Sequence, residues 1–124
     1  MIVCDTNILI ELYRNNTTII AAIETIGQNN VAISDVTRAE LFVGALNKRE
    51  LRTLMKDTNQ LHILPVRKEI SSMSISLLSK YYLSHGLDFH DALIAATAIY
   101  HRFELFTLNT KDFAYIPNIK IYKP

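Results

Sequence analysis

The sequence has 124 residues, the length of a single domain, and we treat residues 1–124 as one domain. Hydrophobic residues make up 49% of the chain and charged residues 20%, proportions that exclude a disordered or low-complexity protein. The formal net charge of +1 provides no overall cationic field of the kind that accompanies nucleic-acid binding. A single cysteine, Cys4, excludes a disulfide framework and a cysteine-based zinc cluster, and we expect its thiol to be reduced and buried.

Nothing in the sequence has the pattern of a targeting signal or a membrane span. Residues 1–14 lack a basic leader, and Asp5 and Glu11 interrupt their apolar residues. The most apolar later segment, residues 92–100, is much shorter than the roughly 18 residues that cross a bilayer. We therefore expect a cytoplasmic protein that makes no contact with membranes.

Short apolar segments alternate with helical ones along the chain. Residues 1–4 are continuously apolar, which predicts a strand buried on both faces. Helices are expected at 6–13 and 18–26, with Gly27 ending the second. The pattern predicts further strands at 31–33, 62–64, 104–107 and 120–122, and further helices at 35–46, 49–60, 66–84 and 88–101. This alternation predicts an α/β fold whose mostly parallel sheet is covered by helices on both faces.

Acidic residues recur where this fold would place a functional site. In open parallel sheets, ligands bind beyond the carboxyl ends of the strands. Asp5 directly follows the first strand, Glu40 lies on the helix after the second, and Asp91 begins the most apolar helix. Asp112 lies in the loop after residues 104–107. The sequence therefore predicts a group of carboxylates at one edge of the sheet.

Each carboxylate also has an explanation in local structure alone. The alternatives are a helix N-cap for Asp5, a capping box with Thr37 for Glu40, a helix start shared with Asp88 for Asp91, and a loop bend for Asp112. The group as a whole is harder to explain in this way, because crowded carboxylates repel one another unless a divalent cation neutralises them. Hard oxygen ligands suit Mg²⁺ or Mn²⁺, and such a site activates water for displacement at phosphorus.

Four segments carry a family resemblance. Residues 3–10 (VCDTNILI), 34–41 (SDVTRAEL), 91–98 (DALIAATA) and 106–113 (FTLNTKDF) occur in the order and spacing of PIN-domain ribonucleases. Within that family the sequence is most similar to VapC-type toxins of toxin–antitoxin pairs. The resemblance implies a three-layer α/β/α fold and an endoribonuclease that depends on Mg²⁺ or Mn²⁺. It also implies products with 5′-phosphate and 3′-hydroxyl ends.

The resemblance assigns roles to the acidic residues. Asp5, Glu40 and Asp91 match the core acidic positions of the family, and Asp5 and Asp91 are the expected direct metal ligands. The fourth position of the site falls on either Asp112 or Asn109. Asp112 is the only carboxylate available there, and Asn109 would be a neutral ligand or would orient a water molecule.

Supporting residues and partners follow from the same resemblance. Thr6 and Thr107 match polar positions that hold the acids, and Asn7 matches a residue that braces the Asp5 loop. The implied partners are an RNA substrate, a VapB-like antitoxin and a second copy of the chain. Residues 9–14 and 41–54 are the segments expected to form the partner surfaces.

Basic residues are concentrated in one part of the chain. Residues 38–68 contain seven basic and three acidic residues, a net +4, whereas the rest of the chain carries six basic against nine acidic, a net −3. We expect Arg38, two residues from Glu40, to contact RNA, the antitoxin or an acid of the site. The histidines lack the spacing of metal ligands and are interpreted as structural or surface residues, and the tyrosines as packing residues.

Two other functions are compatible with parts of the pattern. A catalytically silent PIN-like module would bind RNA or protein, but it would have no reason to keep a costly acidic cluster. A phosphotransfer enzyme would use Asp5 as its nucleophile, but the second aspartate usual in such enzymes is replaced by Asn7, and no glycine-rich phosphate loop is present. The metal-dependent endoribonuclease is therefore the leading hypothesis.

Overall fold

The computed structural model describes all residues from 1 to 124, and its centre is a parallel sheet of four strands in the order β3-β2-β1-β4. The strands are β1 (Ile2–Cys4), β2 (Val31–Ser34), β3 (His62–Leu64) and β4 (Glu104–Phe106). Val3 pairs with Ala32 on one side and with Leu105 on the other, so β1 lies in the interior of the sheet. The predicted parallel sheet is confirmed.

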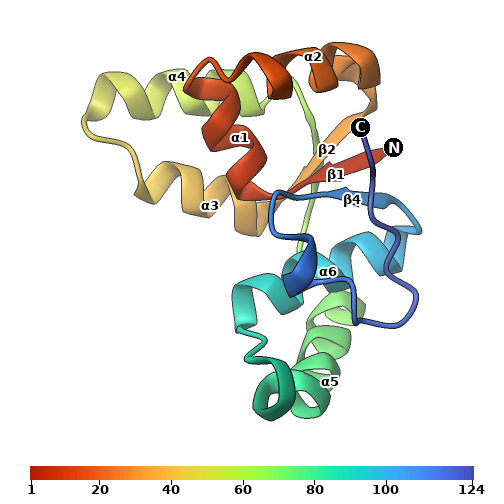
Figure 1. Ribbon diagram of the computed structural model, residues 1–124. Helices are drawn as coiled ribbons and strands as arrows, with labels where there is room; N and C mark the ends of the chain where they lie inside the picture. The colour runs from red at the N-terminus through yellow and green to blue at the C-terminus, as the bar shows by residue number, and fades with distance from the viewer.

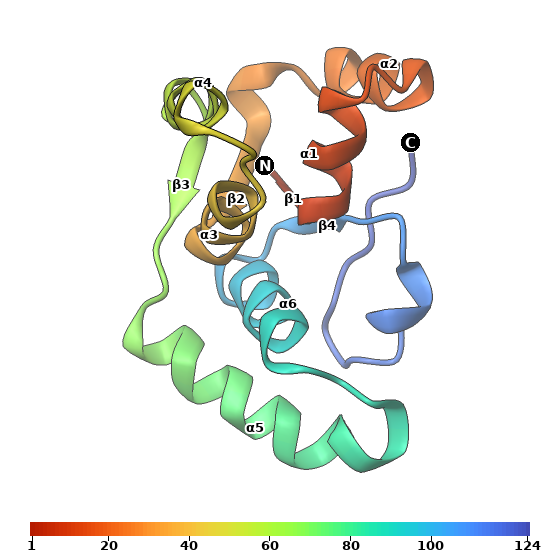
Figure 2. The ribbon, with the colours of Figure 1, turned by 90° about the vertical axis from the view of Figure 1, so that its left-hand side faces the viewer.

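Six α-helices surround the sheet, together with two short 3₁₀ helices. They are α1 (Thr6–Tyr13), α2 (Thr17–Ile26), η1 (Gln28–Asn30), α3 (Asp35–Val43), α4 (Lys48–Thr58), α5 (Lys68–His85), α6 (Phe89–His101) and η2 (Thr110–Asp112). Figure 1 shows α1, α2 and α4 on one side of the sheet and α5 and α6 on the other, and the rotated view in Figure 2 agrees. This is the three-layer α/β/α arrangement. None of the helices combines the length and the apolar character needed to cross a membrane.

Alternating side chains of the strands build two cores. Val3 and Leu105 pack on the side of α5 and α6, whereas Cys4 and Phe106 pack on the side of α1 and α2. Because successive side chains of a strand point to opposite faces, a strand covered on both faces must be apolar throughout. Cys4 is a free, fully buried cysteine as predicted, and burial raises its pKa to about 12, which keeps the thiol protonated.

Helix α6 is the most deeply buried helix of the fold. Seven consecutive residues, from Ala92 to Ala98, are buried, and four of them are alanines. Small side chains let a helix approach its neighbours closely, so the helix backbone has little freedom to move. Its first turn, which carries Asp91, is therefore held on a rigid support.

The structure corrects several predicted boundaries. The helix expected to reach residue 46 ends at Val43, because Gly44 caps it and Asn47 starts α4 as an N-cap. The expected strand at 120–122 is reduced to one bridge, in which Ile121 lies beside Leu105 at the edge of β4. The helix expected from residue 66 begins at Lys68, since the N-cap residue before it is extended. None of these changes moves a candidate site residue to another element.

Two glycines at helix ends offer a matched test of the fold. Gly86 ends α5 with φ +67°, where an added Cβ would have free space but an unfavourable backbone conformation. Gly44 ends α3 with φ −79°. We expect Gly86→Ala to lower the free energy of unfolding by about 1 kcal/mol and Gly44→Ala to change it by less than about half of that. Urea unfolding measures both, and equal effects would contradict the left-handed end of α5.

Candidate active site

The carboxyl ends of three strands deliver polar residues to one edge of the sheet. Asp5 follows β1, Asp35 follows β2 and Thr107 follows β4. The amide of Asp5 donates to the carbonyl of Phe106 over 2.9 Å, so β1 and β4 stay joined up to the site. Asp5 and Thr107 are thereby placed side by side although they are 102 residues apart.

Asp5 is a buried carboxylate with both oxygens engaged. Its side chain is almost covered, at 7% relative exposure. Oδ1 accepts a hydrogen bond of 2.7 Å from the Thr6 amide, and Oδ2 accepts one of 2.8 Å from the Thr107 hydroxyl. The first bond is the N-cap of α1, so the capping explanation for Asp5 is correct and coexists with its place in the site. Its two partners fix the orientation of the carboxylate.

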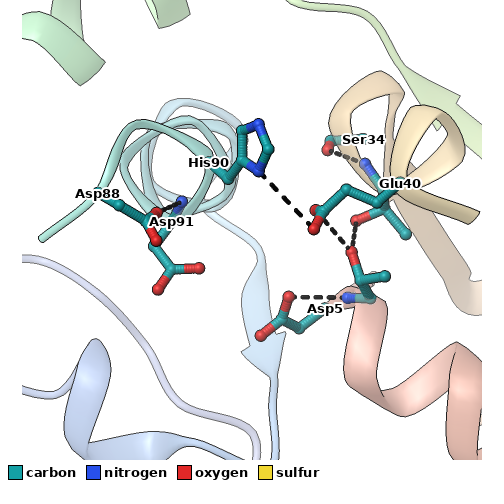
Figure 3. A network of polar contacts seen from close by, with 8 residues as sticks. Asp5, Ser34, Glu40, Asp88, His90 and Asp91 are labelled. Atoms are coloured by element: carbon teal, nitrogen blue, oxygen red, sulfur yellow. Dashed lines mark hydrogen bonds and ion pairs between the residues drawn. The ribbon is translucent and has the colours of Figure 1, made fainter. Parts of the chain in front are cut away.

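Glu40 approaches Asp5 from α3. Its Oε1 accepts a hydrogen bond of 2.9 Å from the Thr6 hydroxyl, which also contacts the Thr37 hydroxyl at 3.2 Å. The capping-box explanation for Glu40 is wrong, because α3 is capped by Ser34, whose hydroxyl accepts from the Thr37 amide. Figure 3 shows the Glu40 carboxylate directed toward the side on which Asp5 lies.

Asp91 completes a group of three from three different elements. Asp88 caps α6 by accepting from the Asp91 amide over 2.8 Å, which is the predicted helix start. That bond uses the backbone of Asp91 and leaves its carboxylate free. In Figure 3 the Asp91 carboxylate points from α6 toward Asp5, across the same gap that Glu40 faces.

The carboxylates affect one another electrostatically. Burial raises the pKa of Asp91 to about 7, with further increases from the charges of Asp88, Asp5, Asp112 and Glu40. Burial also raises the pKa of Asp5, and the charges of Glu40 and Asp112 add to it, while the hydrogen bonds from Thr107 and Thr6 oppose it. Burial and mutual repulsion thus both disfavour the ionised carboxylates, and a bound cation would offset both effects.

The fourth position has two candidates with different surroundings. Asp112 lies at the exposed end of η2, and its charge acts on both Asp5 and Asp91. Asn109 is exposed, and its amide, rather than its side chain, is in contact with the site through a 3.1 Å hydrogen bond to the Thr107 hydroxyl. Asp112 is thus the residue that adds charge to the group, and Asn109 shapes the loop that follows β4.

Asn7 links the first helix to that loop. Its side-chain oxygen accepts from the Leu108 amide at 3.3 Å, and its side-chain nitrogen reaches the Thr107 hydroxyl at 3.5 Å. The loop after β4 is therefore tied to α1 by a residue two positions after Asp5. This placement is that of the brace expected from the sequence.

The oxygen donors of the acidic group determine which metal ion it could bind. No three His, Cys, Asp or Glu side chains converge closely enough to form a ready-made centre. The available donors are carboxylates that repel one another, with no thiolate among them. Mg²⁺ binds through one or two carboxylates and keeps several of its waters, so it does not require three converging protein ligands. The chemistry of the donor set is therefore compatible with a hard divalent cation.

Two basic residues, Arg38 and His90, make contacts that the sequence did not predict. Arg38 contacts none of the proposed site acids, since its guanidinium pairs with Asp35 at 3.2 Å and lies over the Phe42 ring at 5.6 Å. His90, interpreted from the sequence as a structural or surface residue, has its Nδ1 3.8 Å from Oε2 of Glu40. Its partner is 50 residues away on another helix, so the local sequence could not indicate this contact. The only signal in the sequence was the position of His90 in the first turn of α6.

Four of the six tyrosines, Tyr81, Tyr100, Tyr115 and Tyr122, pack against other rings. Tyr81 and Tyr115 meet edge to face, and His85 stacks on Tyr115 with 3.8 Å between ring centroids. Tyr122 packs against Phe106. Tyr81 and Tyr115 pack against one core and Tyr122 against the other.

A groove runs along α1, α3 and α4 to the site. It encloses about 600 Å³ and has apolar and charged walls. Its lining residues are Ile10, Tyr13, Arg14, Glu40, Leu41, Gly44, Leu46, Glu50, Thr53 and Leu54. The predicted partner segments, 9–14 and 41–54, therefore face each other across one groove, and Glu40 belongs to both the groove and the acidic group.

Comparisons with known proteins agree with this architecture. A sequence model of the PIN domain matches residues 2–118. A protein of Rickettsia bellii (strain RML369-C) named Ribonuclease VapC is 30% identical over 128 residues, covering 97% of this chain and 93% of that protein. Among solved structures, a toxin-antitoxin complex from Klebsiella pneumoniae contains a chain with 34% identity and a TM-score of 0.82, covering 100% of both chains. VapBC2 from Rickettsia felis, bound to a promoter DNA fragment, matches with 26% identity and a TM-score of 0.80, covering 98% of each chain.

The raised pKa of Asp91 predicts how stability depends on pH. Because the folded-state pKa of about 7 lies above the ordinary value of 3.8, stability is greatest below the ordinary pKa and is lost as pH rises to about 7. Without divalent cations, Asp91→Asn should be more stable than wild type at pH 8 by about 1–2 kcal/mol after allowance for solvent screening, and equal to it at pH 4. Urea unfolding in EDTA measures this, with the exposed Glu24→Gln on α2 as a control. A difference independent of pH would contradict the prediction.

Proposed function

This chain belongs to the PIN-domain family and is a VapC-type member of it, and from that premise we propose that it is an endoribonuclease toxin of a toxin–antitoxin pair, acting in the cytoplasm. The observation that carries the proposal is the convergence of Asp5, Glu40 and Asp91 at the carboxyl edge of a parallel sheet. The relative named as a ribonuclease and the toxin-antitoxin neighbours support it.

The proposed reaction is hydrolysis of an RNA phosphodiester with Mg²⁺ or Mn²⁺. Asp5 and Asp91 would hold one ion directly, and Glu40 and Asp112 would act through water or help to hold a second ion. When bound, the ion would favour deprotonation of water and offset charge on the phosphoryl oxygens. Attack in line with the departing 3′ oxygen breaks the P–O3′ bond, and the products carry 5′-phosphate and 3′-hydroxyl ends.

The chain's own contribution is to orient the acids before substrate arrives. Thr107 and the Thr6 amide hold the two oxygens of Asp5, and the Thr6 hydroxyl holds Glu40. Asp91 is carried by a helix whose next seven residues are buried. Groups held in this way lose little freedom when the reaction begins, which lowers the free-energy cost of reaching the transition state.

We assign RNA positioning to the basic segment between residues 38 and 68. Its net charge is +4, whereas the rest of the chain carries a net −3. Arg38 lies on the same helix as Glu40, and Asp35 and Phe42 hold its guanidinium in place. Phosphate contacts of this kind place a backbone in register without reading its sequence.

The groove is the proposed site of a VapB-like antitoxin. Its apolar residues, among them Ile10, Leu41 and Leu46, suit apolar side chains of an antitoxin segment, and Glu40 and Glu50 suit basic ones. A segment bound there would end beside Glu40 and obstruct the acidic group. We therefore expect the antitoxin to inhibit the ribonuclease by blocking access to the acidic group.

A second copy of the chain is the other proposed partner. The sequence suggested one surface for both partners, but the structure offers a second on α5 and the start of α6. Ile75, Tyr82, Leu83 and Phe89 are exposed there, and all but Leu83 line one shallow hollow. We propose that this face, on the opposite side of the sheet from the groove, forms the homodimer.

Isosteric changes of the acids test the nuclease directly. Asp5→Asn and Asp91→Asn should each reduce cleavage of total cellular RNA more than about a hundredfold, because each removes a charged metal ligand and little else. EDTA should abolish wild-type cleavage, and Mg²⁺ or Mn²⁺ should restore it. Ligation of the fragments by an enzyme that requires 5′-phosphate ends identifies the products.

The exposed Glu24→Gln serves as the control, and circular dichroism verifies that each variant is folded. Wild-type activity in Asp5→Asn would show that the acids are not the active centre. If wild type cleaves nothing but retains RNA in a gel shift, after mass spectrometry has excluded bound antitoxin, the protein is a silent RNA-binding module instead.

Two exposed leucines separate the proposed partner surfaces. Leu46 on the groove is 85% exposed and Leu83 on α5 is 95% exposed, so an aspartate at either position should leave the fold intact. Leu46→Asp should weaken antitoxin binding by about tenfold or more, whereas Leu83→Asp should leave that Kd unchanged and lower self-association. Calorimetry and analytical ultracentrifugation measure the two effects, and an exchange of the two outcomes would contradict the assignment.

A further inference from the structure

Glu40 is approached by donors from two other helices. Its Oε1 accepts from the Thr6 hydroxyl of α1 at 2.9 Å, and its Oε2 lies 3.8 Å from Nδ1 of His90 on α6. Figure 3 shows the His90 ring extending from α6 toward Glu40, while Asp91, the next residue, points toward Asp5. One turn of α6 thus faces the site with two successive side chains.

We propose that His90 is a positioning residue for the ribonuclease reaction, which holds Glu40 in place by donating from Nδ1–H to the Glu40 carboxylate when RNA is bound. The inference rests on the proposed function and adds a residue to it. His90 acts on the reaction through Glu40 and is not itself assigned a contact with the reacting atoms.

The distance is consistent with this role. A separation of 3.8 Å exceeds a hydrogen bond, and contacts of this kind in free enzymes are often long and shorten in the substrate complex. The Glu40 side chain is 33% exposed and that of His90 63% exposed, so both have room to close the gap. The contact spans α3 and α6, the helices that carry Glu40 and Asp91.

The backbone of His90 is well placed to serve as an anchor. Asp88 caps α6 through the Asp91 amide, so the turn that contains His90 is closed by a hydrogen bond of 2.8 Å. The helix beyond it is buried from Ala92 to Ala98. A carboxylate on α3 that is tied to this support keeps a constant separation from Asp91. Without the contact to His90, the Glu40 carboxylate keeps only the hydrogen bond from the Thr6 hydroxyl and can rotate about that bond.

Separate asparagine and glutamine variants of His90 distinguish the roles of its two ring nitrogens. The side-chain nitrogen of asparagine takes about the place of Nδ1, and that of glutamine about the place of Nε2. If His90 acts through Glu40, His90→Asn should preserve activity and His90→Gln should not. If the ring instead contacts RNA through Nε2, the glutamine variant should be the active one.

The experiment measures kcat and KM for RNA cleavage in wild type, His90→Ala, His90→Asn and His90→Gln. We expect His90→Ala and His90→Gln to lower kcat about tenfold with KM unchanged, and His90→Asn to remain within about threefold of wild type. Glu24→Gln on α2 is the control, since Glu24 is exposed, lies outside the acidic group, the basic segment and the groove, and should give wild-type values. Thermal unfolding of each variant verifies that the fold is kept.

Three outcomes would overturn the inference. Wild-type kcat in His90→Ala would show that Glu40 needs no second donor. A rise in KM that glutamine corrects would make His90 an RNA contact. Cleavage that is equal in wild type and Asp5→Asn would remove the proposed function itself, and this result is recognisable without any His90 variant.

Discussion

The structure depends on the placement of one buried carboxylate, that of Asp5, at the point where β1 passes into α1. The Thr6 amide and the Thr107 hydroxyl hold its two oxygens, so the same group caps a helix and joins β1 to the loop after β4. Burial of a charge is costly unless it is paired or bonded, and here only neutral donors are supplied. The pKa of Asp5 is raised because these donors do not fully compensate for the free-energy cost of burying its charge. A residue needed only as a cap would have no reason to bear it.

Parallel topology explains why the other acids gather around Asp5. All four strands run in one direction, so segments that are distant in sequence leave the sheet at a common edge. Glu40 and Asp91 arrive from α3 and α6, one on each flank of Asp5, and Asp112 follows from η2. Burial of Asp91, together with the repulsion between these carboxylates, destabilises the cation-free protein at neutral pH. A bound divalent cation would relieve the same repulsion. The acids therefore lower the stability of the cation-free protein and favour cation binding.

The sequence was most informative where a residue is explained by its immediate neighbours. Asp5 after an apolar strand and Asp91 before an apolar helix were located from local pattern alone, as were all four strands of the sheet. Glu40 was ambiguous, because a capping box and a long-range bond to Thr6 have the same local sequence. His90 could not be found, since its exposure gives no hydrophobic signal and its partner lies on α3. The strand expected at 120–122 was too short for pattern to distinguish it from a single bridge.

Glu40 connects the two parts of the proposed function. It belongs to the acidic group through Thr6 and His90, and it also lines the groove between α1, α3 and α4. A basic side chain that entered the groove would compete for the oxygens that Thr6 and His90 now approach. The antitoxin would then inhibit by two physical effects at once, obstruction of the substrate and displacement of Glu40 from its orientation. Because one carboxylate serves both surfaces, a change that frees the nuclease from its partner at this residue would also impair the nuclease.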